Sequence, residues 1–289
     1  MKGRLLLLAA TALAGVGASV PAAAQAAPAA AQAAPAFSSK RFSVLVKGHG
    51  PDVILIPGLS SSRDVWSGTV AAVPGYRYHL IQVAGFAGEK AGANASGAVV
   101  APVADEIARY IAARGLQRPA LVGHSMGGTL AMMAAARHPQ RVGKVMVVDM
   151  LPQPAGLLGS SATGVRGLAD SLRGLTATEG GRRLVASVVD MFAPPEKEDS
   201  RSDPDVVARA THELATTDLT PELPRIAAPL TVVYAAPTAE EAPLLDRDYR
   251  AAYARKRGAR LIRVDGSGHM IMYDQPARFR AALKAFLGR

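Results

Sequence analysis

A single serine flanked by glycines gives this chain its clearest chemical signal. A short apolar run leads into Gly123–Gly127, with Ser125 at the centre, and an Ala- and Met-rich segment follows. This order predicts a strand, a sharp turn and a helix. The positions two before and two after the serine must be small because such a turn crowds them. Ser125 is then exposed as a nucleophile for acyl transfer, and the N–H of Met126 points to where an oxyanion would form.

A serine hydroxyl at neutral pH needs a base within hydrogen-bond reach before it attacks a carbonyl group. His269 has the best setting among the six histidines, because it follows the last predicted strand on a glycine-flanked loop. That loop lies on the same predicted sheet edge as Ser125. His124 adjoins the serine but points differently on the turn, and we expect it to pack. The remaining histidines are expected at turns, strand ends or the surface: His49, His79, His138 and His212.

A second oxyanion donor is predicted where an earlier strand ends. The continuously apolar run Val53–Ile56 is followed by Pro57, Gly58 and Leu59. Glycine at the end of a central strand lets the loop turn back closely over the sheet, so the N–H of Leu59 is the expected donor. Ser60–Ser62 are interpreted as polar loop and helix-cap residues.

Strands and helices alternate along the chain. Apolar β-type runs predict strands at Leu121 and over 42–46, 53–56, 78–83, 142–148, 230–234 and 260–264. Helical spacing of apolar residues predicts helices over 98–113, 126–137, 244–257 and 276–287. This alternation predicts an α/β protein with a mostly parallel central sheet, helices on both faces and a ligand site at the carboxyl ends of the strands.

The stretch from about 150 to 225 breaks the alternation. It is rich in Gly, Pro and charged residues, and its apolar residues recur at helical spacing. We interpret it as a small helical lid insertion, because it leaves a strand end on the catalytic side. An ordinary crossover with decoration is the alternative, although the stretch is long for one.

The amino-terminal residues predict export. Lys2 and Arg4 precede an apolar run, and Ala22–Ala24 supply a small-residue cleavage site, so residues 1–24 are predicted to be a secretory signal peptide. An uncleaved membrane anchor is the alternative. Residues 25–36 contain only Ala, Gln and Pro, which predicts a disordered linker before a domain over 37–289. We expect a periplasmic or secreted protein without stable membrane insertion after leader cleavage.

Composition narrows the classes of cofactor and partner. The 289 residues contain no cysteine, and the six histidines are scattered, so no metal or other cofactor is predicted. The net charge of +10 comes from dispersed cations, and aromatic residues make up only 5% of the chain. No nucleic-acid groove is predicted from that pattern. The expected partner is a small-molecule substrate.

From Phe37 onward the chain resembles the α/β-hydrolase fold superfamily, in its serine-nucleophile, esterase-like branch. Three matching features occur in order: Pro57–Trp66 as an oxyanion loop, Gly123–Gly127 as a nucleophile elbow, and Gly268–His269 with Asp274, Gln275 and Pro276 after it. The resemblance implies the α/β-hydrolase fold. A serine at the elbow disfavours haloalkane dehalogenase and epoxide hydrolase chemistry, which in the resembling families use an aspartate there.

The chain departs from that family pattern at two places. Pro57 stands where the oxyanion loop often has histidine, with little expected effect because only backbone N–H groups are required. The usual acid behind the base is missing after the strand 230–234, where Ala235–Ala239 contains no carboxylate. Asp149, at the end of the strand that follows the serine's helix, is the favoured replacement because some relatives place their acid there. Glu240 or Glu241 is the alternative, and a site without an acid is the third.

The leading hypothesis is a serine hydrolase that cleaves an ester-type acyl bond through an acyl-enzyme on Ser125, as a carboxylesterase does. Transfer of the acyl group to an acceptor other than water, and hydrolysis of thioester, amide or carbon–carbon bonds, stay open. A rival hypothesis is a binding or sensor protein that keeps the fold with weakened catalysis, and only the missing acid supports it.

Overall fold

The structure, a computed structural model, describes residues 37–154, 178–181 and 202–288. Ala36–Arg289 form one unit of the chain. The predicted signal peptide and linker lie outside the described residues, as does most of the predicted insertion. Among the helices of the described part, none is long and apolar enough to cross a membrane.

Seven strands of the described chain form one sheet in the order β1-β3-β2-β4-β5-β6-β7. Strand β1 pairs antiparallel with β3, and every other pairing is parallel. The predicted α/β class with a mostly parallel sheet is therefore confirmed. The strands are β1 (Phe42–Lys47), β2 (Asp52–Ile56), β3 (Arg77–Val83), β4 (Ala120–His124), β5 (Lys144–Val148), β6 (Leu230–Ala236) and β7 (Arg260–Asp265).

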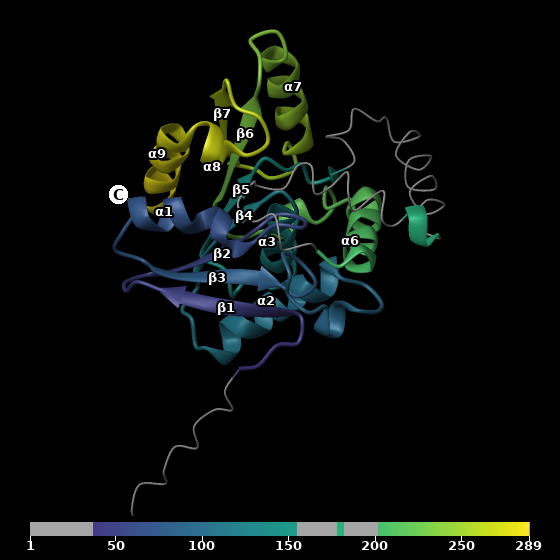
Figure 1. The fold of residues 1–289 in the computed structure, drawn as a ribbon. Helices are drawn as coiled ribbons and strands as arrows, with labels where there is room; N and C mark the ends of the chain where they lie inside the picture. The colour runs from purple at the N-terminus through teal and green to yellow at the C-terminus, as the bar shows by residue number, and fades with distance from the viewer. Residues whose placement is uncertain (1–36, 155–177, 182–201, 289) are drawn as a thin grey trace, which may run out of the picture. The chain divides into compact units, whose positions relative to one another are not determined.

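Helices lie on both faces of this sheet (Figure 1). On one face α1 packs against α9, and on the other α2 contacts both α3 and α6. The helices are α1 (Ser67–Ala72), α2 (Val100–Ala113), α3 (Met126–Arg137), α6 (Pro204–Thr216), α7 (Ala242–Ala252), α8 (Ile271–Asp274) and α9 (Pro276–Leu287). Short 3₁₀ turns occur at Arg63–Trp66, Gly92–Asn94 and Leu223–Arg225.

Alternate residues of a strand enter two different cores. In β2, Ile54 and Ile56 join the core that α2 and α3 cover, whereas Val53 and Leu55 join the core that contains Trp66. Successive side chains of a strand point to opposite faces, so a sheet covered on both faces needs apolar residues at every position. The apolar run Val53–Ile56 is uninterrupted because both faces of the sheet are covered there.

Three predicted elements are shorter in the structure than the sequence pattern suggested, and one of them is the helix expected over 98–113, which begins at Val100. The strand expected over 142–148 begins at Lys144, which lies opposite Ala120, the first residue of β4. Gly143, just before it, passes so close to a neighbouring loop that a Cβ atom there would lie 2.2 Å from the Arg118 carbonyl oxygen. The helix expected over 244–257 spans Ala242–Ala252 and ends in a turn that passes through Gly258 at φ +73°.

The described end of the predicted insertion belongs to the core. Helix α6 is capped by Asp203, whose carboxylate accepts hydrogen bonds from the N–H groups of Asp205 and Val206, and Pro204 is the first residue of the helix. Its apolar side chains are buried in the core shared with α2 and α3: Val206, Val207, Ala210 and Leu214. Residues 155–177 and 182–201 lie outside the described residues, so the lid itself stays a prediction.

A carboxylate from α6 caps the amino end of α2. Val99, at the start of α2, provides no side-chain cap. Instead, Glu213 accepts hydrogen bonds from the N–H of Val99 at 2.6 Å and from the N–H of Val100 at 2.9 Å. A negative charge at a helix amino end satisfies unpaired donors and interacts favourably with the helix dipole.

Replacing Glu213 with glutamine should lower the free energy of unfolding by about 1–2 kcal/mol, because it removes the charge and leaves one acceptor for two donors. Urea unfolding measures the change. Thr216→Ala, at an exposed position of α6, is the control and should shift the free energy by less than about 0.5 kcal/mol. An unchanged unfolding midpoint for Glu213→Gln would show that the cap contributes no stability.

Candidate active site

Three strands end beside one another at the carboxyl edge of the sheet. In the register of the sheet, Ile56 of β2 lies opposite Gly123 of β4, and His124 of β4 lies opposite Val148 of β5. The residues that follow these strands therefore meet at one edge. Ser125 and Asp149 are each the first residue after their strand, and in parallel α/β sheets this edge is where ligands bind.

Ser125 sits on a strained turn between β4 and α3. Its backbone angles are φ 52° and ψ −123°, a conformation that residues other than glycine rarely adopt. A Cβ atom on Gly123 would lie 2.0 Å from the Gly127 carbonyl oxygen, and one on Gly127 would lie 2.3 Å from the Ile56 carbonyl oxygen. Both glycines are thus required by close backbone contacts, as the sequence spacing predicted.

The loop after β2 runs directly beside this serine. A Cβ atom on Gly58 would lie 3.2 Å from Ser125 Cβ and 3.0 Å from His124 Nδ1. Within the described residues, neither the N–H of Leu59 nor that of Met126 donates to another protein group. Met126 is the first residue of α3, and the first N–H groups of a helix have no partner within it. The two predicted oxyanion donors therefore flank the serine with open N–H groups.

Asp149 contacts the predicted base. His269 Nδ1 lies 2.7 Å from Asp149 Oδ2, and about a third of the His269 side chain is exposed. The other carboxylate oxygen accepts hydrogen bonds from the N–H of Ala235 at 2.9 Å and the hydroxyl of Tyr249 at 3.1 Å. Asp149 is buried and its own backbone has φ +51°. The carboxylate is thus held by three donors, one of which is the imidazole.

The end of β6 supports the acid without supplying it. The sequence lacks a carboxylate there, and the structure shows that the Ala235 N–H from that strand donates to Asp149, just after the neighbouring strand β5. Tyr249, on α7, was not singled out from the sequence. Burial, with the Asp149 carboxylate beside it, raises the pKa of Tyr249 well above its ordinary value, so its hydroxyl keeps its proton and donates.

The alternative acids lie elsewhere. Glu240 and Glu241 are exposed at the start of α7, and the Glu241 carboxylate accepts a hydrogen bond from the Thr238 hydroxyl. Neither forms a hydrogen bond with His269. In the described structure no hydrogen bond joins Ser125 Oγ to His269 either, and catalytic hydrogen bonds of this kind often tighten only when substrate binds. The residues described contain no group of three or more His, Asp or Glu that fits a metal ion.

Three hydrogen bonds fix the loop that carries His269. The Gly268 N–H donates to the Asp274 carboxylate at 2.9 Å, and the Gln275 amide donates to the Gly266 carbonyl at 2.9 Å. His124 Nε2 lies 3.0 Å from the His269 carbonyl oxygen, and the two imidazole rings lie 4.6 Å apart. His124, expected to pack, therefore packs against the predicted base. This contact spans 145 positions of the chain and has no local sequence signal.

His124 is a neutral imidazole with a defined tautomer. A carbonyl oxygen only accepts, so His124 Nε2 carries the proton that it donates to His269. Its Nδ1 has no hydrogen-bond partner among the described residues. Complete burial, with the nearby His269 as a further cause, lowers the pKa of His124 to about 3. His124 therefore adds no positive charge beside Ser125 at neutral pH.

Replacing His124 with glutamine should make stability less dependent on pH. Between its pKa of about 3 in the folded protein and its ordinary value of 6.5, His124 binds a proton only when the protein unfolds. Its contribution is therefore complete above pH 6.5 and is lost as pH falls below it, by about 1.4 kcal/mol per pH unit. Urea unfolding of both proteins from pH 5 to 7 measures the difference. Equal slopes would contradict a neutral buried His124.

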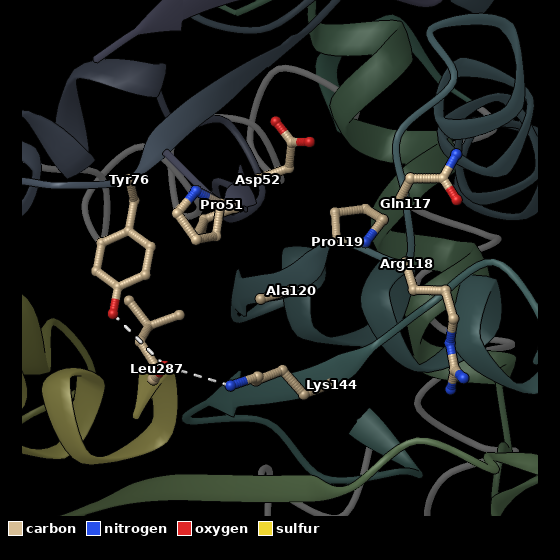
Figure 2. Close-up of a pocket in the computed structure, with 10 residues that line it drawn as sticks. Pro51, Asp52, Tyr76, Gln117, Arg118, Pro119, Ala120, Lys144 and Leu287 are labelled. Atoms are coloured by element: carbon tan, nitrogen blue, oxygen red, sulfur yellow. Dashed lines mark hydrogen bonds between the residues drawn. The ribbon is translucent and has the colours of Figure 1, made fainter. Parts of the chain in front are cut away.

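A separate cavity of about 260 Å³ lies at the opposite edge of the sheet (Figure 2). Its lining includes the first residues of β2, β4 and β5, which are Asp52, Ala120 and Lys144. Lys144 Nζ donates to the carbonyl oxygens of Phe286 and Leu287 at the carboxyl end of α9. A positive charge at this end of a helix interacts favourably with the helix dipole. None of the predicted site residues lines this cavity, so their chemistry belongs to the carboxyl edge.

Comparison with known proteins agrees with this architecture. The profile of the Alpha/beta hydrolase family matches residues 53–282. An N-formylmaleamate deformylase of Pseudomonas putida is 28% identical over 83% of this chain and 90% of its own. A pimeloyl-[acyl-carrier protein] methyl ester esterase of Vibrio atlanticus is 32% identical, but the match covers 37% of this chain and only 40% of the esterase. The solved structure of a thermophilic esterase from Thermogutta terrifontis aligns with a TM-score of 0.67 at 21% identity, covering 85% of this chain and 92% of the esterase.

Proposed function

Since the chain belongs to the Alpha/beta hydrolase family, we propose that it is a serine hydrolase that cleaves a small or medium ester through an acyl-enzyme on Ser125. One observation carries the proposal. The imidazole of His269 is bound at Nδ1 by the buried carboxylate of Asp149 at 2.7 Å, at the sheet edge where Ser125 stands on its strained turn. A nucleophile, a base and an acid that orients the base form the minimal set for this chemistry.

Each group has one role in the proposed reaction. Ser125 Oγ attacks the acyl carbonyl carbon while His269 Nε2 takes the hydroxyl proton. The N–H groups of Leu59 and Met126 bind the oxyanion that forms. His269 returns the proton to the leaving alcohol, and water then cleaves the acyl-enzyme by the same steps, with His269 as its base. Asp149 stabilises the imidazolium and fixes its tautomer without taking the proton itself.

A formyl amide is the second candidate substrate. This candidate is considered because one relative, which aligns with 83% of this chain, is named an N-formylmaleamate deformylase. Hydrolysis of p-nitrophenyl acetate, butyrate and octanoate, compared with N-formyl amides at equal concentration, separates the two candidates. We expect the higher kcat/KM for an ester. Preferential hydrolysis of the formyl amide would reassign the substrate class, and no hydrolysis of either would favour the binding or sensor protein.

A further inference from the structure

The hydroxyl of one buried serine joins three segments at the carboxyl edge. Ser202 stands just before α6, and its Oγ accepts hydrogen bonds from Ser60 Oγ at 2.6 Å and from the Ala87 N–H at 3.0 Å. The same Oγ donates to the Ser60 carbonyl oxygen at 3.3 Å. A hydroxyl has one proton and two lone pairs, so its bonding capacity is filled. Ser202 thus ties the end of the predicted insertion to the loops that follow β2 and β3.

The loop after β2 contains a strained turn at Ser60. The Ser61 N–H donates to the Gly58 carbonyl oxygen at 3.3 Å, which closes a four-residue turn with Ser60 at its third position. Ser60 has φ +60°, as that position has in a type II turn, where glycine is favoured. A residue other than glycine keeps such a conformation only where its surroundings hold it. Two hydrogen bonds between the serines contribute to that hold: Ser60 Oγ donates to Ser202 Oγ, and Ser202 Oγ donates to the Ser60 carbonyl oxygen.

The turn sets the direction of the Leu59 N–H. The peptide unit between Gly58 and Leu59 is planar and trans, so its carbonyl and N–H point in opposite directions. Because the Gly58 carbonyl oxygen faces Ser61 inside the turn, the Leu59 N–H points out of it. Opening of the turn at Ser60 would release the Gly58 carbonyl oxygen from the Ser61 N–H and leave this peptide, with its Leu59 N–H, free to rotate.

The segment that carries Ser202 is itself firmly docked. The Asp203 N–H donates to the Gly85 carbonyl oxygen at 2.7 Å, in the loop after β3. A Cβ atom on Gly85 would lie 2.7 Å from a Val206 methyl group, so α6 contacts that loop closely. Val206 is buried in the main core. Ser202 therefore holds the turn against a fixed part of the protein.

We propose that Ser202 is a positioning residue for the oxyanion turn Gly58–Ser61, and that it keeps the Leu59 N–H in place to bind the oxyanion. The inference rests on the proposed function, because it assigns Ser202 a role in that same reaction. It links the end of the insertion to catalysis without contact between Ser202 and the substrate.

Ser202→Ala is the direct test, with kcat expressed per Ser125 labelled by a fluorophosphonate probe. Loss of a whole oxyanion donor lowers kcat by about 100-fold or more, so a displaced donor should lower it by roughly 10-fold. We expect KM to stay within about twofold, since the donor acts mainly in the transition state. Ser202→Thr keeps the hydroxyl and should therefore keep most of the wild-type kcat.

Matched variants separate positioning from general destabilisation. Ser60→Ala removes one of the two hydrogen bonds between these serines and should lose less kcat than Ser202→Ala, which removes both. The double variant should lose no more than Ser202→Ala alone, because the bond from the Ser60 hydroxyl is already absent there. Thr216→Ala, on α6 but distant from the turn in sequence and exposed, should keep the wild-type kcat. Hydrogen exchange of residues 53–66 should speed up in Ser202→Ala, which tests the hold on the turn independently of any reaction.

The outcomes are distinct. A wild-type kcat per labelled serine in Ser202→Ala, or losses that multiply in the double variant, would overturn the inference. Unchanged hydrogen exchange of residues 53–66 would overturn it as well, even if kcat fell. A folded wild-type protein that is not labelled at Ser125 would instead refute the proposed function, and the exchange measurement would still decide whether Ser202 holds the turn.

Discussion

Ser125→Ala should lower kcat/KM for ester hydrolysis by about 10⁴-fold or more, since it removes the only atom that forms the acyl-enzyme. The fold should survive, because alanine meets the same backbone strain at φ 52° as serine does. Residual hydrolysis without a covalent intermediate would come from the oxyanion donors alone. Initial rates on p-nitrophenyl butyrate measure the loss.

A glycine at the same position provides a control that separates strain from chemistry. Ser125→Gly should be as inactive as Ser125→Ala but more stable than it, by about 1 kcal/mol, because glycine adopts this conformation without strain. Urea unfolding of the two variants gives the difference. An alanine variant that retains activity within tenfold of the wild type would show that Ser125 is not the nucleophile.

Asp149→Asn should lower kcat by roughly 10³- to 10⁴-fold with little change in stability. Asparagine tolerates the left-handed backbone that Asp149 has at φ +51°, so the change removes charge rather than shape. The loss follows because an amide no longer stabilises the imidazolium and permits the wrong tautomer of His269. Steady-state rates on the same ester measure it.

Two comparisons make the assignment of the acid specific. The double variant Glu240→Gln/Glu241→Gln should keep kcat within about twofold, because both side chains are exposed and form no hydrogen bond with His269. Tyr249→Phe removes one donor to Asp149 and leaves the carboxylate, so its effect on kcat should be several-fold. A large loss in the glutamate variant, with none in Asp149→Asn, would place the acid just before α7, at Glu240 or Glu241.

The fold and the elbow were predictable because their causes are local. Gly123 is dictated by its close contact with Gly127, four positions along the chain, and the apolar runs follow from a sheet covered on both faces. The antiparallel direction of β1 was not predicted, because the pattern of an edge strand is the same in either direction. The signal peptide over residues 1–24 and the linker over 25–36 stay predictions. Amino-terminal sequencing of the exported protein would check them.

Asp149 is favoured by the resemblance, but the sequence does not exclude Glu240, Glu241 or a site without an acid, because the setting of the acid is not local. Asp149 meets His269 across 120 positions and Ala235 across 86, through strands whose order the sequence does not state. The support from Tyr249 and the contact between His124 and His269 depend on the same long-range packing. One general rule applies to Tyr249: the hydroxyl of a tyrosine buried on a helix needs a hydrogen-bond partner. The rule does not say which residue that partner is.

Covalent labelling of the intact protein tests the central claim most directly. A fluorophosphonate reacts with a serine only where a base activates the hydroxyl and donors stabilise the developing oxyanion. The proposed function predicts one label per wild-type molecule, mapped by peptide mass to Ser125 and absent from Ser125→Ala. A folded wild-type protein that takes no label, or a Ser125→Ala variant labelled equally, would contradict it.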